Sequence, residues 1–460
     1  MNAESFVHGD PIAPVILGVT SILAFAIVGR VGARKLGQPT VLGELIMGIL
    51  LGNIAWYFGV DLIAVLREGP HVFELVHETL AGASVDEAAV HIFGVERGAE
   101  IARIITGPQG GQIIKVAETV DVFSRYGIIF LLFMVGLETT IEELESVGGD
   151  SIRVALIGVI APVALGFGVV SWLRPDIALD ASLFIAATLA ATSIGITADV
   201  LHEGGKNKSE AGRIILGAAV CDDVLGLILL AAVSAIIVHG SVDLGEIIML
   251  VVISTLFLVA TAVLGPRMVR YAAHLMRGLD IVEAKMFTSF LFVMLLAWVA
   301  SLAGLATIIG AFAAGIVMRD RFFRENGEPA MNGEVRVREL IMPLEVIFVP
   351  IFFILMGIQV KLESFMSWPV VILAAGLIVV AIVGKVVSGF GAHRSAGRML
   401  VGVGMLPRGE VGLVFAAIGR SLGVIDDAMF SAIVLMVIVT TLIAPEWLAF
   451  LIDREGRRLR

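Results

Sequence analysis

The sequence predicts an all-α polytopic membrane protein with about thirteen transmembrane helices. Hydrophobic residues make up 58% of its 460 residues and charged residues 16%, whereas soluble domains have about 45–50% apolar and roughly 25% charged residues. The mean hydropathy is +0.98. Apolar runs of about 17 to 25 residues, long enough to cross a bilayer as helices, recur along the whole chain. This composition excludes a soluble globular protein.

Thirteen apolar runs are predicted to span the membrane. They lie near residues 13–31, 40–56, 122–137, 151–173, 180–201, 213–238, 244–265, 284–302, 304–318, 339–358, 367–390, 397–418 and 427–451. A count of twelve remains open, because the third run is weak and the eighth and ninth are separated by only a short connection. The whole chain, 1–460, is expected to form a single integral membrane unit.

The 32 Lys and Arg residues predict the orientation of the chain. With these spans, 22 of them lie in the loops after odd-numbered spans and in the C-terminal tail, 8 lie on the other side, and Lys385 and Arg408 lie inside spans. Cytoplasmic loops retain positive charge, so we expect an outside N-terminus and a cytoplasmic C-terminus in a bacterial inner membrane. Residues 1–11 contain no Lys or Arg, which argues against a cleaved signal peptide.

Residues 57–121 form a long segment between the second and third spans, on the predicted external side. The segment is acidic, and apolar residues recur at helical spacing within 71–80 and 90–105. This pattern predicts short amphipathic helices lying on the outer surface. A solvated cap without chemistry is the alternative interpretation.

Two adjacent aspartates, Asp222 and Asp223, lie in the middle of the apolar run 213–238. A carboxylate at the centre of a membrane helix costs roughly 3 kcal/mol, and a second one beside it adds like-charge repulsion. Intramembrane charges of this kind typically mark an ion or proton pathway. The pair therefore predicts a site where a cation and protons compete for the same oxygens, as in an ion-coupled transporter.

The chain also contains a short internal likeness. Residues 133–138 (FMVGLE) resemble residues 354–359 (ILMGIQ), and Glu142 or Glu363 follows each run. The two helices are predicted to run in opposite directions, which is typical of inverted repeats with a substrate site near the bilayer midplane. Chance similarity between apolar runs is the alternative.

Two spans contain interruptions that predict broken helices. The run 190–197 contains the hydroxyls of Thr192 and Ser193 beside a glycine, and the run 404–410 contains Pro407, Arg408 and Glu410. Proline removes a backbone donor, and non-helical backbone at membrane depth occurs where it lines a cavity or is buried in protein. Hydroxyls that only bond back to their own helix are the alternative for the first run. We expect Arg408 and Glu410 to have an ion-pair role that supports the second break.

Lys385 is the remaining charge deep inside a span. At 1.5 Å per residue it lies roughly 12 Å from His393 at the span edge, and Asp223 lies roughly 15 Å from Arg213. Both depths approach the middle of a core about 30 Å thick. Lys385 is therefore expected to meet the aspartate pair, whereas a snorkelling lysine would reach over only part of that distance.

These features together resemble the monovalent cation:proton antiporter-2 family. The likeness extends in order from the first span to the last. Its elements are the runs 38–44 (QPTVLGE) with Gly48 and Gly52, 130–138, 221–223 (CDD), 350–357, 384–385 (GK) and 407–410 (PRGE). The resemblance implies a homodimer in the membrane lipid, with a dimerisation domain beside a core domain that contains two crossed broken helices and moves as an elevator.

The resemblance also assigns roles to single residues. It implies that Asp223 binds the Na⁺ or H⁺, that Asp222 is its partner, and that Lys385 is the coupling lysine. Thr192 and Ser193 fall on the crossover hydroxyls, either as cation ligands or as support for the crossing. No cofactor, enzymatic activity or nucleic-acid partner is expected.

The chain departs from the family's potassium-efflux members in two respects. They commonly have glutamine before the aspartate where this chain has Asp222, and they add a cytoplasmic nucleotide-binding domain, which is not expected here because the chain ends about ten residues after its last span. Both differences favour Na⁺/H⁺ exchange, with Li⁺ as a further substrate. If Na⁺ loosens an ion pair between Lys385 and Asp222 and the lysine releases a proton, two protons are exchanged per sodium and transport is electrogenic. K⁺/H⁺ exchange and a sodium-coupled carrier of an organic solute remain alternatives.

Overall fold

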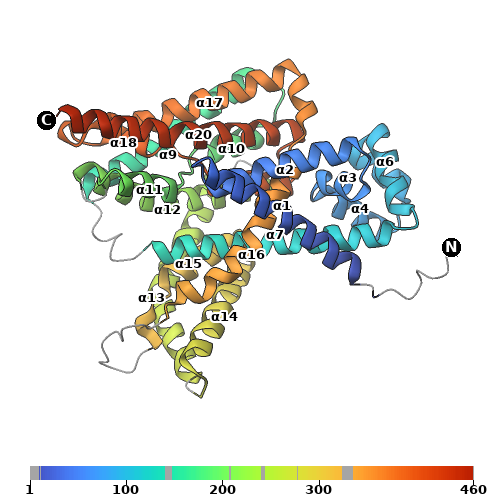
Figure 1. Cartoon of the computed structure of the whole chain (residues 1–460), viewed down its shortest axis with the longest axis horizontal. Coiled ribbons are helices and arrows are strands. Elements are labelled where there is room, and N and C mark those ends of the chain that lie inside the picture. The colour runs from blue at the N-terminus through green and yellow to red at the C-terminus, as the bar shows by residue number, and fades with distance from the viewer. Residues whose placement is uncertain are drawn as a thin grey trace. The chain divides into compact units, whose positions relative to one another are not determined.

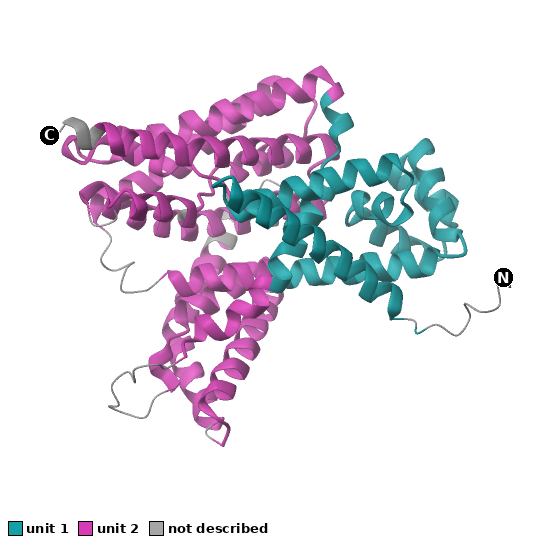
Figure 2. Ribbon diagram, viewed as in Figure 1, with its two compact units in different colours: residues 1–127, 347–365 teal, residues 128–346, 366–460 magenta. Residues whose placement is uncertain are grey.

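The computed structural model describes residues 10, 12–139, 148–206, 209–239, 244–276, 278–323 and 335–458. Over these ranges the chain is helical and contains no strand (Figure 1). It divides into two compact units (Figure 2): unit 1 comprises residues 1–127 and 347–365, and unit 2 comprises residues 128–346 and 366–460. The predicted all-α class is therefore confirmed.

The predicted spans coincide with helices. In the described ranges, ten helices are long and apolar enough to cross a membrane. They are α1 (Ala13–Lys35), α2 (Thr40–Tyr57), α7 (Gly110–Glu138), α9 (Gly149–Leu173), α12 (Glu210–His239), α13 (Leu244–Leu275), α14 (Ile281–Leu302), α16 (Val337–Ile358), α17 (Trp368–Ser388) and α20 (Asp427–Arg458). The number of spans, thirteen or twelve, stays a prediction.

The three remaining predicted spans are shorter or interrupted helices. The ninth is α15 (Thr307–Val317). The fifth consists of α10 (Leu179–Thr188) and α11 (Ile194–Glu203), and the twelfth of α18 (Arg398–Gly404) and α19 (Glu410–Ser421). Helices interrupted in this way leave backbone donors and acceptors without intrahelical partners.

The segment 57–121 is helical and packed within unit 1. It contains α3 (Asp61–Glu68), α4 (His71–Leu80), α5 (Val85–Phe93) and α6 (Val95–Thr106). Helix α7 begins at Gly110, about a dozen residues before the apolar run that predicted it. Charged residues on the exposed side of its first turns lower the local hydropathy, while Ile113, Val116 and Val120 are buried and continue the helix.

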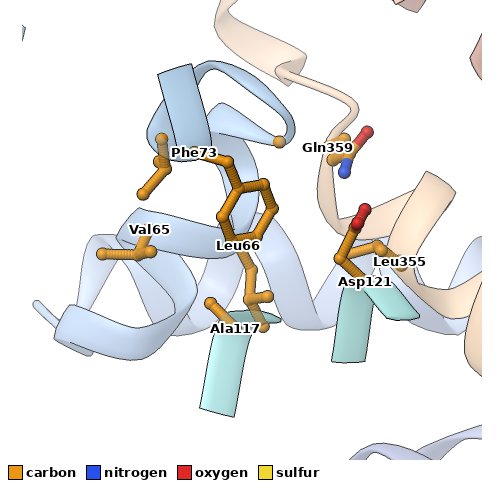
Figure 3. Close-up of a pocket in the computed structure, with 9 residues that line it drawn as sticks. Val65, Leu66, Phe73, Ala117, Asp121, Leu355 and Gln359 are labelled. Carbon is orange, nitrogen blue, oxygen red and sulfur yellow. The ribbon is translucent and has the colours of Figure 1, made fainter. Parts of the chain in front are cut away.

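Ion pairs fasten this segment to the end of α16. Arg67 Nη2 lies 2.7 Å from Glu363 Oε2, and Lys361 Nζ lies 2.8 Å from Glu68 Oε2. Between the segment and α7 there is a small cavity of about 10 Å³ (Figure 3), into which Asp121 and Gln359 bring polar atoms. A cavity of that size has room for about one water molecule.

Two glycine crossings repeat the same geometry in the two units. In unit 1, a Cβ on Gly48 of α2 would lie 2.3 Å from the carbonyl oxygen of Ile354 and 2.9 Å from Gly357 Cα of α16. In unit 2, a Cβ on Gly136 of α7 would lie 2.3 Å from the carbonyl oxygen of Phe312 and 3.0 Å from Gly315 Cα of α15. Each crossing uses a glycine from one of the two similar runs.

We expect Gly48→Ala to destabilise the protein by roughly 1–3 kcal/mol, because the added methyl group meets backbone that cannot move aside. Gly32→Ala in α1 is the matched control, since a Cβ there meets nothing within 4 Å. The control is expected to be neutral or stabilising by up to about 1 kcal/mol. Thermal unfolding in detergent, followed by tryptophan fluorescence, measures both, and equal melting temperatures would contradict the close crossing.

Within unit 2, helices α9, α12, α17 and α20 pack around the broken pairs. Helix α9 packs against α10, α12 and α17, and α20 packs against α17, α18 and α19; α9, α17 and α20 run side by side in Figure 1. Helices α13, α14 and α15 pack on one another. Both breaks, the aspartate pair and Lys385 therefore belong to one packed bundle.

Candidate functional site

The two breaks cross each other and are joined by backbone hydrogen bonds. Residues 189–193 separate α10 from α11, and residues 405–409 separate α18 from α19. The Ser193 N–H donates to the Pro407 carbonyl at 2.9 Å, and Arg408 Nη1 donates to the Ala191 carbonyl at 2.8 Å. Each break thus supplies hydrogen-bonding partners that the other has lost by leaving its helix.

The hydroxyl of Ser193 makes two hydrogen bonds in this crossing. It accepts from the Gly409 N–H at 2.7 Å and donates to Glu410 Oε2 at 3.1 Å. Ser193 is also 1% exposed. The crossing is tight, because a Cβ at Gly409 would lie 2.7 Å from the Ser193 hydroxyl oxygen. Only glycine fits there without a shift of that side chain.

Two threonines add hydrogen bonds from the first broken helix to the carbonyls at the end of α18. Thr192 Oγ1 donates to the Met405 carbonyl at 3.3 Å, and Thr197 Oγ1 donates to the Gly404 carbonyl at 2.7 Å. Thr197 lies in the interrupted run, but no feature of the sequence distinguishes it from the neighbouring hydroxyls. Its partner becomes evident only when α18 is placed beside it.

Lys385 contacts the first of the two aspartates. Its Nζ lies 2.9 Å from Asp222 Oδ1, and both side chains are fully buried. Helix α9 lies against this pair at Gly158, where a Cβ would be in ordinary van der Waals contact, 3.5 Å from Lys385 Nζ and 3.8 Å from Asp222 Oδ1. Helices α9 and α17 approach closely near this level, because a Cβ on Gly384 would lie 2.8 Å from Pro162 Cα.

Asp223 follows Asp222 in α12 and has a carboxylate oxygen without a hydrogen-bond partner in the described ranges. Its residue is 8% exposed, and within the described ranges Oδ2 of Asp223 and Oδ2 of Asp222 have no hydrogen-bond partner. Buried polar atoms nearly always have a partner, which can be an ion or water. Carboxylate oxygens are ligands that hard cations prefer, and they also accept protons. The two aspartates can therefore receive a cation or protons without displacing a protein partner.

Arg408 and Glu410 do not pair with each other in the described part of the chain. Glu410 accepts from Ser193, while Arg408 is fully buried, donates to Ala191 and accepts at its carbonyl from Thr441. Its Nε and Nη2 have no partner among the described residues. The charge of Arg408 acts on Asp222, so it adds a second cation to the field around the aspartates.

More exposed acids surround the buried ones. Glu410 and Glu138 both interact electrostatically with Asp223, and Glu138 also interacts with Asp199. Glu138 forms a 2.5 Å ion pair with Arg338, and both side chains are about half exposed. A series of carboxylates from solvent to a buried site raises the local concentration of cations. In the sequence, Glu138 and Asp199 resembled ordinary charges at span ends, whereas Glu410 was already expected to support the second break.

Comparison with known proteins gives a consistent result. A family model described as "Sodium/hydrogen exchanger, transmembrane" matches residues 89–454. The high-affinity Na⁺/H⁺ antiporter NhaS3 of Synechocystis sp. is 36% identical over 456 residues, which cover 95% of this chain and 90% of that protein. The Na⁺/H⁺-K⁺ antiporter GerN of Bacillus cereus is 33% identical over 373 residues, which cover 79% of this chain and 91% of that protein.

A solved structure has the same fold. The sodium proton antiporter MjNhaP1 from Methanocaldococcus jannaschii aligns with a TM-score of 0.64 over 96% of this chain and 99% of that chain, at 14% sequence identity. At that identity the likeness concerns the fold alone.

Proposed function

Because the chain belongs to the transmembrane sodium/hydrogen exchanger family, we propose that it exchanges Na⁺, and Li⁺ as a close substitute, for H⁺ across a membrane. The observation that supports this most strongly is the buried pair of carboxylates with two open oxygens beside Lys385. The relatives NhaS3 and GerN are both described as Na⁺/H⁺ antiporters. Asp222 and Asp223 are the Na⁺ ligands in this proposal.

The exchange rests on competition at Asp223. With the site facing one side, Na⁺ binds to the open oxygens and the proton on Asp223 leaves. The arriving positive charge weakens the bond between Lys385 and Asp222, and Lys385 releases a second proton. Two protons then move for each sodium, which makes transport electrogenic. Movement of the core domain as an elevator, in a homodimer with an outside N-terminus and a cytoplasmic C-terminus in a bacterial inner membrane, completes the proposal.

Reconstituted protein tests this function. In proteoliposomes with an imposed pH gradient, we expect Na⁺ and Li⁺ to dissipate the gradient and an imposed membrane potential to change the rate. Exchange that is indifferent to the potential would contradict the two-proton stoichiometry. Uptake of an organic solute without cation-dependent proton flux would select the sodium-coupled carrier instead.

K⁺/H⁺ exchange is the second candidate, because the relative GerN is described as acting on both Na⁺ and K⁺. Oxygen ligands accept either ion, and selectivity depends on the size and rigidity of the cavity. The same proteoliposome assay with K⁺ in place of Na⁺ distinguishes the two. A K⁺ response equal to or larger than the Na⁺ response would make this candidate the better one.

Of the two roles that the sequence left open for Ser193, we favour support of the crossing. We expect Ser193→Ala to lower stability by about 1–3 kcal/mol, since the Gly409 N–H is then buried without its acceptor, and to slow exchange while leaving the apparent Na⁺ affinity unchanged. Ser421→Ala, which removes an exposed hydroxyl at the end of α19, is the matched control. A lowered Na⁺ affinity with intact stability would instead assign Ser193 to the cation.

A further inference from the structure

The connection between α17 and α18 is fastened to two other helices by one histidine. This connection, residues 389–397, follows the helix that contains Lys385 and precedes the second break. The backbone N–H of His393 donates to Asp150 Oδ2 at 3.1 Å, and its Nδ1 contacts the same carboxylate. On the other side of the ring, Nε2 lies 2.9 Å from Glu210 Oε1.

The two carboxylates come from the first turns of the helices that flank the ion pair. Asp150 lies at the start of α9, which contains Gly158, and Glu210 is the first residue of α12, which contains Asp222 and Asp223. His393 therefore links the connection between α17 and α18 to the starts of α9 and α12. Its side chain is 43% exposed, so it exchanges protons with the solvent.

The rest of the connection is packed without polar contacts to α12. Ala392 and Ala396 are 1% and 3% exposed in a core cluster that includes Ile215 of α12. Gly391 fits against α9, where a Cβ would lie 2.7 Å from the Val154 nitrogen. Apolar packing thus sets the position of the connection. The contacts of His393 add polar interactions that hold the exposed side of the connection against α9 and α12.

The protonation state of the ring determines how many of these contacts are hydrogen bonds. An imidazolium donates from both nitrogens, whereas neutral imidazole donates from one and presents a lone pair from the other. Only the charged form can donate to Asp150 and Glu210 together. With neutral imidazole, one carboxylate faces a lone pair and that contact is lost.

The other charges near the ring do not replace it. Arg153 of α9 contacts Asp150. Arg398, the first residue of α18, donates to the Ala392 carbonyl at 2.9 Å, and Arg394 of the connection is exposed. The charges that act most on the ring are the carboxylates of Asp150 and Glu210. No cation within the described part of α12 is bonded to Glu210 in place of His393.

We propose that His393 is a proton-controlled latch, which holds the connection 389–397 against the starts of α9 and α12 when its ring is charged and releases it when its ring is neutral. Both ends of the connection lead to the transport site, through α17 to Lys385 and through α18 to the second break. The effect on exchange rests on the function proposed above, whereas the latch itself does not.

The direction of the pH dependence follows from the contacts. The hydrogen bond to Asp150, followed by that to Glu210, raises the pKa of His393 above its ordinary value. A group whose pKa is raised by folding stabilises the folded state fully below its unfolded pKa, roughly 6.5 for histidine, and this stabilisation disappears as pH rises through the folded pKa. The latch is therefore closed in acid and opens on the alkaline side.

Hydrogen exchange of the purified full-length protein tests the latch without any transport. Protection of amides in 389–398, corrected for the intrinsic pH dependence of exchange, is measured between about pH 6 and about pH 9, on either side of the ordinary histidine pKa. We expect this protection to fall with rising pH in wild type and to stay unchanged in His393→Gln. In His393→Arg we expect protection to be retained to high pH. His202→Gln, at the exposed end of α11, is the matched control and is expected to behave as wild type.

A fall that persists in His393→Gln, or that is absent from wild type, would overturn the latch. In proteoliposomes, the exchange rate of His393→Gln relative to wild type is expected to approach one at about pH 9 and to depart from one at about pH 6. If this ratio of exchange rates is the same at both pH values, the protonation of His393 does not affect transport. Absence of exchange at every pH, with the hydrogen-exchange pattern intact, would contradict the proposed function and leave the latch standing.

Discussion

We expect the replacement of Asp223 by asparagine to abolish cation/proton exchange. Asparagine has nearly the same shape, so the bundle is expected to fold, but it neither takes up a proton nor offers a charged oxygen. Loss of one charged ligand removes about 3 kcal/mol or more of cation binding, which corresponds to a rate or affinity loss on the order of 100-fold or more. Dissipation of a pH gradient in proteoliposomes measures the effect.

The matched control for this variant is Asp86→Asn, at an exposed position in α5, and it is expected to exchange like wild type. Melting temperatures of both variants show whether the fold survives. If Asp223→Asn exchanges near the wild-type rate and melts at the wild-type temperature, Asp223 is not the residue that binds the cation and the proton.

Replacing Lys385 by methionine is expected to destabilise the protein by about 3–5 kcal/mol, the usual cost of leaving one member of a buried ion pair without its partner. The Lys385 and Asp222 side chains are both fully buried, so water cannot solvate the remaining carboxylate. Thermal unfolding in detergent detects a change of this size. The variant is also expected to lose the dependence of exchange on membrane potential, because the second proton is missing.

A double variant isolates the pair. With Asp222→Asn added to Lys385→Met, neither position of the pair carries a charge whose partner has been removed, and much of the lost stability is expected to return. If the double variant loses as much unfolding free energy as the two single variants together, the two side chains do not interact with each other.

Much of the helical plan was predictable because the chain spans a bilayer. Each apolar run became one helix or one interrupted pair, since backbone groups in lipid must be satisfied within the chain. The start of α7 at Gly110 was missed because its first turns present charges on one side and buried apolar residues on the other. Packing of residues 57–121 by Arg67 and Lys361 depends on partners nearly 300 residues away, which no local pattern indicates.

The site was predictable where a charge stood out against apolar neighbours. Depth within the apolar runs predicted that Lys385 meets the aspartate pair, and Lys385 contacts Asp222. The partners of Arg408 and Glu410 were not predictable, because these residues bond to Ala191 and Ser193 of the other break and not to each other. Gly158 and Thr197 gave no signal in the sequence, since each matters only through a helix packed beside it.

The likeness of the two short runs gained support from geometry. Gly136 and Gly357 occupy the same place in those runs, and each meets a second glycine at a closely matched Cβ distance. A chance similarity between apolar segments would not reproduce the contacts of both glycines. Inverted repeats also account for two broken helices that meet at their interruptions.

Proton release on cation binding tests the competition at Asp223 most directly. Purified protein in weakly buffered detergent solution is mixed with NaCl or with choline chloride, and the pH change is recorded with an indicator dye. The account predicts that Na⁺ releases protons from wild type, that choline releases none, and that Asp223→Asn releases none with either salt. Binding of Na⁺ to wild type without any release of protons would contradict it.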